Sequence, residues 1–155
     1  MNPFIDAWQG ALAAEQQAVF GFGLIGPHLD NNDQPRALAS QSAHEAARDA
    51  IMAAMTAAHV SPVNAKADYP GLYPVSTLAQ ALAVAARLED ACAVGWRVLY
   101  LASAVDPAAA KQAGYPDAPA RRTEAQQGLT TAAVAATQWR KIAGAVPASR
   151  AFPGV

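Results

Sequence analysis

The sequence predicts an all-α protein: a bundle of four long helices with a long crossover between the second and third. Alanine, the strongest helix former, supplies 41 of the 155 residues. Four segments repeat apolar residues every three or four positions, and clusters of proline and glycine separate them. No stretch alternates apolar and polar residues over a length that would predict a strand.

The first two predicted helices lie on either side of a short polar loop. The first covers residues 6–24 and ends before Gly26-Pro27, which would break it. The second begins after Asp33, a residue type suited to capping, has Pro35 in its first turn and ends near residue 59. The apolar stripe of the first helix is Trp8, Leu12, Glu15, Val19 and Phe22.

The last two long helices are predicted from the same periodicity. The third covers residues 76–104, with Ser76 as its N-cap, and the fourth covers residues 120–143. Between them a short extra helix can begin at Asp106-Pro107 and end at Gly114. The third stripe is Leu78, Leu82, Ala85, Glu89, Cys92, Trp96 and Leu99. The fourth is Ala125, Leu129, Ala132, Ala136, Trp139 and Ala143.

The connections predict how the helices are joined. The first and last pairs have short joins, which favour antiparallel neighbours. Residues 60–75 contain three prolines and cannot be helical throughout. Fifteen extended residues span about 50 Å, whereas a 25-residue helix is about 37 Å long. This segment can therefore cross the whole bundle and leave the second and third helices parallel, within one domain over residues 1–155.

Composition excludes several classes of protein. Eleven Lys and Arg against twelve Asp and Glu give a net charge of −1, so we expect no nucleic-acid or membrane partner. The single cysteine excludes an intrachain disulfide. The first ten residues lack a signal-peptide pattern, and we expect a cytoplasmic protein. Alanine-rich faces and the near-neutral charge lead us to expect a homodimer.

The informative residues are polar ones at core positions. Glu15 and Glu89 interrupt the stripes of the first and third helices, and Gln41, His44 and Arg48 share one face of the second. Counting from the helix ends places all five at a similar depth. A buried carboxylate is unfavourable unless it is paired or binds a metal, so we expect these residues to form one buried polar cluster.

Two interpretations of this cluster stay open. In the first it is a metal-free network without a cofactor, in which Arg48 supplies the positive charge and His44 and Gln41 complete the hydrogen bonds. Arg48→Ala would then destabilise the fold by roughly 3–5 kcal/mol. In the alternative, Glu15, His44 and Glu89 hold one iron, manganese or zinc ion. Cys92 and the three tryptophans are expected to pack the core.

The chain resembles the ferritin-like superfamily, whose di-iron proteins use one Glu from each of two helices and a Glu-x-x-His from each of the other two. Glu15 and Glu89 match the lone glutamates, and Gln41-x-x-His44 matches one Glu-x-x-His with Gln in place of Glu. The fourth helix has no such motif, so the resemblance implies a degenerate di-metal site. More narrowly, the chain looks like the ferritin-like domain family of unknown function common in high-GC bacteria. The segments that carry this likeness are 14–23, 43–49, 88–90, Trp96-Arg97, Trp139-Arg140 and 151–154.

Three functions are compatible with these features. The first is a non-catalytic structural or interaction protein on a ferritin-like scaffold. The second is a single-metal-binding or redox protein that uses Glu15, His44 and Glu89. The third is a small-ligand binder with a cavity between alanine-rich helices, which a ligand-sized cavity in the structure would favour.

Overall fold

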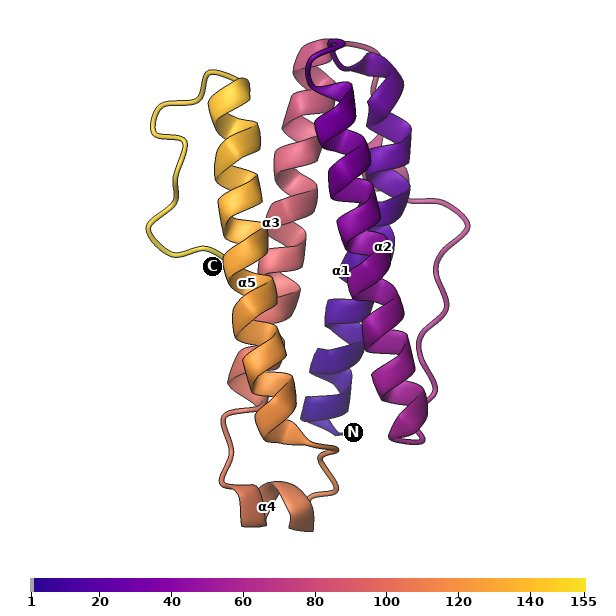
Figure 1. The fold of residues 1–155 in the computed structure, drawn as a ribbon, viewed down its shortest axis with the longest axis vertical. Helices are drawn as coiled ribbons and strands as arrows, with labels where there is room; N and C mark the ends of the chain where they lie inside the picture. Colours follow the sequence, from indigo (N-terminus) through magenta and orange to yellow (C-terminus); the bar gives the residue numbers. More distant parts are fainter. Residues whose placement is uncertain (1) are drawn as a thin grey trace.

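The computed structural model describes residues 2–155 and is all-helical within that range, which confirms the predicted class. The short helix between the last two long ones is also present (Figure 1). The elements are α1 (Pro3–Ile25), η1 (Gly26–His28), α2 (Gln34–Ala57), η2 (Pro70–Leu72), α3 (Leu78–Ala102), α4 (Pro107–Gln112) and α5 (Ala118–Ile142).

Local hydrogen bonds set helix starts that differ from the predicted ones. Oδ1 of Asn2 accepts from the backbone N–H groups of Phe4 and Ile5, so α1 begins earlier than predicted. The N-cap of α3 is Thr77, and the prediction of Ser76 was wrong by one residue. The Thr77 hydroxyl accepts from the backbone N–H of Gln80, whose side-chain oxygen accepts from the backbone N–H of Ser76.

The predicted capping role of Asp33 was wrong. Its side chain makes no cap hydrogen bond, because its backbone is already helical (φ −101°, ψ −17°) rather than extended as an N-cap requires. Its backbone carbonyl instead accepts from the N–H of Ala37 at 3.0 Å. Pro35 lies in the first turn of α2, as its missing N–H and fixed φ favour.

The segment between α2 and α3 returns along the outside of the molecule, so that these two helices run in the same direction (Figure 1). Two glutamines of α1 attach it. Gln9 donates to the carbonyl of Ser61 and accepts from the N–H of Val63, both at 2.8 Å. Gln16 donates to the carbonyl of Val63 at 2.8 Å. These bonds satisfy backbone groups of Ser61 and Val63, so the crossover needs no regular secondary structure at these residues.

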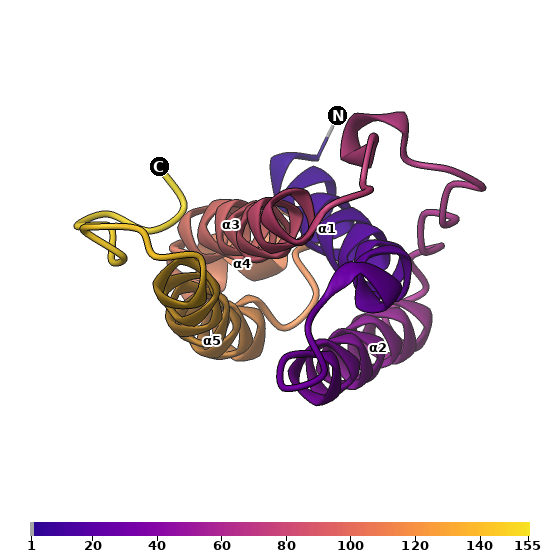
Figure 2. The same ribbon diagram turned by 90° about the horizontal axis from the view of Figure 1, so that it is seen from above.

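The long helices form a central pair with one helix on each flank. α1 and α3 pack against each other, α2 packs on α1, and α5 packs on α3. The view along the helices shows α2 and α5 on the same side of this pair (Figure 2). Trp8, Trp96 and Trp139 are buried, as predicted. Among residues 2–155, no helix is both long enough and apolar enough to traverse a bilayer.

Candidate functional site

His44, in the middle of α2, is the centre of a buried polar cluster. Its Nδ1 lies 2.6 Å from Oε2 of Glu15 on α1, and its Nε2 lies 3.4 Å from Oε1 of Glu89 on α3. The imidazole ring stacks on Phe22 with ring centroids 5.4 Å apart. Three helices thus place one histidine between two carboxylates at a common depth.

Both carboxylate oxygens of Glu15 have partners. While Oε2 faces His44, Oε1 accepts a hydrogen bond of 2.7 Å from the indole Nε1 of Trp96 on α3. Trp96 was expected only to pack the core. Part of the signal was available, because Trp96 lies on a predicted core stripe and a buried indole N–H needs an acceptor.

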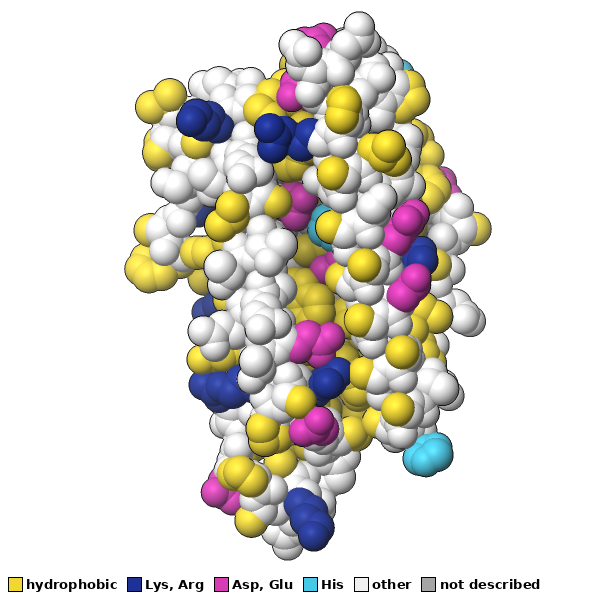
Figure 3. All heavy atoms as spheres, in the orientation of Figure 1, with side chains coloured by type: hydrophobic (Ala, Val, Ile, Leu, Met, Phe, Trp, Pro, Cys, Tyr) yellow, Lys and Arg dark blue, Asp and Glu magenta, His cyan; other side chains and the backbone are white. Residues whose placement is uncertain are grey.

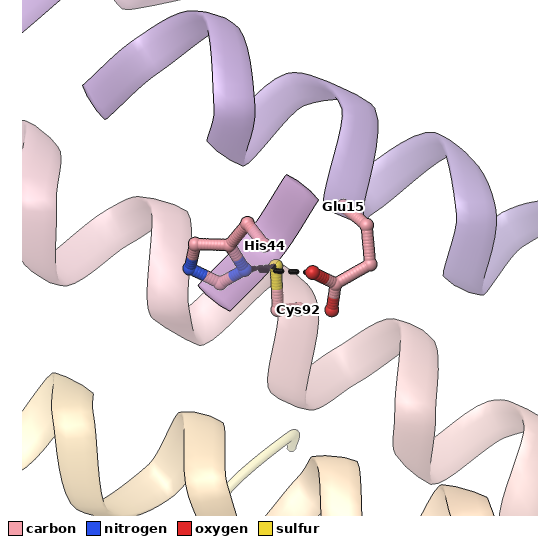
Figure 4. A group of neighbouring side chains, drawn as sticks. All are labelled: Glu15, His44 and Cys92. Carbon is pink, nitrogen blue, oxygen red and sulfur yellow. Dashed lines mark hydrogen bonds and ion pairs between the residues drawn. The ribbon is translucent and has the colours of Figure 1, made fainter. Parts of the chain in front are cut away.

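Cys92 on α3 is a further member of the cluster, and its side chain points toward those of His44 and Glu15 (Figure 4). Its Sγ is 3.9 Å from Nδ1 of His44. One ligand atom each from Glu15, His44 and Cys92 lie within 4.8 Å of one another. The prediction that Cys92 packs the core agrees with its complete burial, but its contact with His44 was not foreseen.

The carboxylates favour a protonated His44. Burial alone would lower the pKa of His44, but the contacts with Cys92, Glu15 and Glu89 outweigh burial and raise the pKa. We attribute the rise to the carboxylates, because burial also raises the pKa of the Cys92 thiol and keeps it neutral. Burial raises the pKa of Glu89 as well, although His44 opposes this effect. The cluster therefore contains an imidazolium that bridges two acidic side chains.

The cluster forms the floor of a groove between α2 and α5. The groove has a volume of about 490 Å³, and a histidine and acidic side chains are visible in the hollow between the two helices (Figure 3). Its walls carry small side chains: Ala39, Ala43 and Ala47 on α2, and Gly128, Ala132 and Ala135 on α5. Glu15, His44, Glu89 and Trp96 line it from below, and Arg36 of α2 donates to Gln138 of α5 at 3.2 Å.

Comparisons with known proteins identify the family of this chain. A family model described as a domain of unknown function, DUF4439, matches residues 7–155. The chain belongs to the DUF4439 family. The crystal structure of a conserved hypothetical protein, Rv2844, from Mycobacterium tuberculosis is similar to the DUF4439 chain, with a TM-score of 0.77 and 24% sequence identity. The match covers 90% of this chain and 96% of that one, and at this identity it shows a shared fold. No curated protein matches.

Arg48 does not join the cluster in the DUF4439 chain, so its predicted role as the counter-charge was wrong. Its Nε donates to Oδ1 of Asp49 at 2.8 Å, on an exposed side of α2. A guanidinium there avoids the desolvation that a place among the carboxylates would require. His44 supplies the positive charge instead.

Gln41 was also expected in the cluster. In the structure it lines a separate surface groove, together with Gly23 at the end of α1. Within residues 2–155 it makes no hydrogen bond to Glu15, His44 or Glu89. Gln41 lies about one helical turn before His44, and at that distance its side chain does not reach the carboxylates.

The residues of the DUF4439 chain do not fit the di-metal site that the ferritin-like resemblance implies. On α5 the groove-lining carboxylate Glu124 is paired with Arg121 at 2.9 Å. The predicted single-metal set does not converge either, because Glu15 and Glu89 contact different ring nitrogens of His44. An imidazole offers one lone pair to a metal, so one ion cannot take all three side chains in this orientation.

Proposed function

We propose that this protein binds a small organic ligand in the groove between α2 and α5. The observation that supports the proposal is the groove itself, whose volume of about 490 Å³ lies among those of small-molecule sites. Small-molecule sites combine apolar walls with a few convergent polar groups. Here alanines form much of the walls, and Glu89, His44 and Trp96 lie together at the floor.

The shifted pKa values support the same location. Titratable groups displaced from their ordinary pKa by burial and by specific partners concentrate at functional sites. His44 and Glu89 are both shifted, and both line the groove. The nucleophilic side chain beside them is Cys92, and burial raises the pKa of its thiol, which keeps it protonated and unreactive. The proposed role is therefore binding without catalysis.

We also propose that the fold is a ferritin-like four-helix bundle whose di-metal site has degenerated. The four long helices and the long connection between parallel α2 and α3 support this assignment. Loss of ligands on α5 would leave the space between α2 and α5 for an organic molecule.

The test is ligand-observed NMR with a panel of small cationic, neutral and anionic fragments. We expect some fragments to bind the wild-type chain. Ala43→Trp would place an indole in the groove and abolish their binding. Ala46→Trp, on an exposed position of the same helix outside the groove, is the matched control and should leave binding intact. Absence of binding to the wild type, or binding that survives Ala43→Trp, would contradict the proposal.

A second candidate function is the binding of a single metal ion, and a different set of ligands supports it. Glu15, His44 and Cys92 converge, and oxygen, nitrogen and sulfur ligands together suit zinc. Glu89 would then accept from the other ring nitrogen of His44 and fix its tautomer. Metal binding must displace protons from His44 and Cys92, whose raised pKa values oppose it, and for this reason we place it second.

Thermal melts with added iron, manganese or zinc test the second candidate. A rise in Tm with one metal, abolished by both His44→Gln and Cys92→Ser, would support it. Glu89→Gln should weaken the effect without abolishing it, because Glu89 contacts the histidine and not the ion. An unchanged Tm with all three metals would exclude it.

A further inference from the structure

The floor of the groove contains a carboxylate that the protein does not fully satisfy. Glu15 accepts from both His44 and Trp96, whereas the contact of Glu89 with His44 Nε2 is 3.4 Å, longer than a well-formed hydrogen bond. Within residues 2–155 no other side chain donates to Glu89. Glu89 is 2% exposed and lines the groove. A buried carboxylate of this kind favours a partner that enters from the groove.

The floor places one cation, His44, against two acidic side chains. His44 carries a single charge and faces two carboxylates, of which Glu15 is the closer partner. Two further charged side chains of opposite sign, Arg36 and Glu124, also line the groove. Glu124 pairs with Arg121 at 2.9 Å, and Arg36 is held by Gln138. Of the two carboxyl groups that contact His44, Glu89 has the longer contact and no second donor among residues 2–155, so it is the one that a ligand can engage.

The indole of Trp96 also lines the groove. It packs closely on α5, where a Cβ on Gly128 would lie 2.5 Å from the indole. Its hydrogen bond to Glu15 fixes its orientation. Gly128 therefore covers part of the ring, and the rest of the indole borders the groove as an apolar surface.

We propose that the ligand of this groove is a small protonated amine, with its ammonium group at Glu89 and its apolar body between Trp96 and the alanine walls. This inference rests on the proposed function and specifies its ligand class. The ammonium supplies N–H donors to Glu89, and its positive charge favours the ionised form of that carboxyl group. The groove volume of about 490 Å³ and the small wall residues accommodate an alkyl or aryl body.

The experiment compares three probes with the same six-carbon body: hexylamine, hexan-1-ol and hexanoate. Their affinities are measured by titration calorimetry and ligand-observed NMR. We expect hexylamine to bind at least about tenfold more tightly than the alcohol, as a charge-assisted hydrogen bond would give. Potassium chloride, added to the ionic strength of the hexylamine salt, should not displace hexylamine, because the site selects an organic cation.

Glu89→Gln should reduce the affinity for hexylamine to that for hexan-1-ol and leave the affinity for the alcohol unchanged. Glu124→Gln, which alters another groove carboxylate that already has a partner, is the matched control and should leave hexylamine binding intact. If Glu89→Gln fails to fold, the wild-type preference for the amine, together with NOEs between its α-methylene and the Trp96 indole, still tests the inference.

The outcomes separate the two proposals. If none of the three probes binds and no fragment of the larger panel binds, the proposed function fails. If the alcohol or the carboxylate binds as tightly as the amine, or if Glu89→Gln leaves hexylamine binding unchanged, the groove function stands and the amine inference is wrong.

Discussion

Trp96 donates its indole N–H to Oε1 of Glu15 at 2.7 Å, and this bond joins α3 to α1 at the buried layer that contains His44. Because His44 holds the other oxygen of Glu15 at 2.6 Å, the carboxylate is fixed from two helices at once. One tryptophan therefore orients the anion that pairs with the imidazolium and also forms part of the groove floor.

Trp96→Phe tests this relationship. The substitution keeps most of the apolar contact but leaves Oε1 of Glu15 without its donor. We expect a loss of about 1–3 kcal/mol in the free energy of unfolding, measured by urea denaturation. Trp8→Phe is the matched control, because Trp8 is equally buried and its indole N–H has no partner. Equal losses for the two variants would show that the bond to Glu15 contributes nothing.

His44→Gln and Arg48→Ala distinguish the observed counter-charge from the one predicted from the sequence. Removing the imidazolium leaves two buried carboxylates without a cation, which should reduce the free energy of unfolding by about 3–5 kcal/mol. Arg48 is partly exposed and pairs only with Asp49, so Arg48→Ala should change it by no more than about 0.5 kcal/mol. The reverse order of the two effects would contradict the assignment of His44 as the counter-charge.

The helices were predictable because short segments of sequence determine where a helix forms and where it ends. Periodic apolar residues and prolines define them, and the long segment with three prolines indicated the crossover. The caps at Asn2 and Thr77 were missed because Ser, Thr, Asn and Asp can all cap a helix, and the sequence does not show which of several neighbouring candidates does so. The attachment of the crossover to Gln9 and Gln16 depends on tertiary contacts that periodicity does not describe.

The candidate site was predictable only in part, because its details also depend on tertiary contacts. Counting residues from the helix ends gives depth along the bundle, and it placed Glu15, His44 and Glu89 in one layer. It does not give the direction of a long side chain, so Arg48 was assigned to the carboxylates although Asp49 lies closer. The groove depends on the separation of α2 and α5, which no short stretch of sequence encodes.

Homodimerisation stays a prediction, and the structure suggests where to test it. Val134 on α5 is 53% exposed, and Phe152 in the tail that runs beside α5 is 75% exposed (Figure 1). Apolar side chains so exposed on one side of a molecule favour association. We expect a dimer by sedimentation velocity at high micromolar concentration and a monomer for Val134→Asp. Val94→Asp, at a similarly exposed position on α3, should stay dimeric; a monomeric wild type would refute the prediction.

The pH dependence of stability provides a test of the imidazolium at the centre of the cluster. In the folded chain burial lowers the pKa of His44, but its contacts with Cys92, Glu15 and Glu89 outweigh burial and raise the pKa from 6.5 to about 12. The unfolded chain loses this proton near pH 6.5, so the stabilisation is complete below that pH and is lost as the pH rises toward the folded pKa. The free energy of unfolding should therefore fall between pH 7 and 10, by up to about 1.4 kcal/mol per pH unit.

Two variants separate the contributions of His44 and Cys92 to this fall in the free energy of unfolding. Burial raises the pKa of Cys92 from 9.0 to about 12, so the thiol adds a second loss of stability that begins only near pH 9. In urea titrations across this range, Cys92→Ala should flatten the curve above pH 9 alone, whereas His44→Gln should flatten it from pH 7 upward. A wild-type stability that is constant from pH 7 to 9 would mean that His44 is neutral in the folded chain. The two carboxylates would then have to be protonated or bound to another cation.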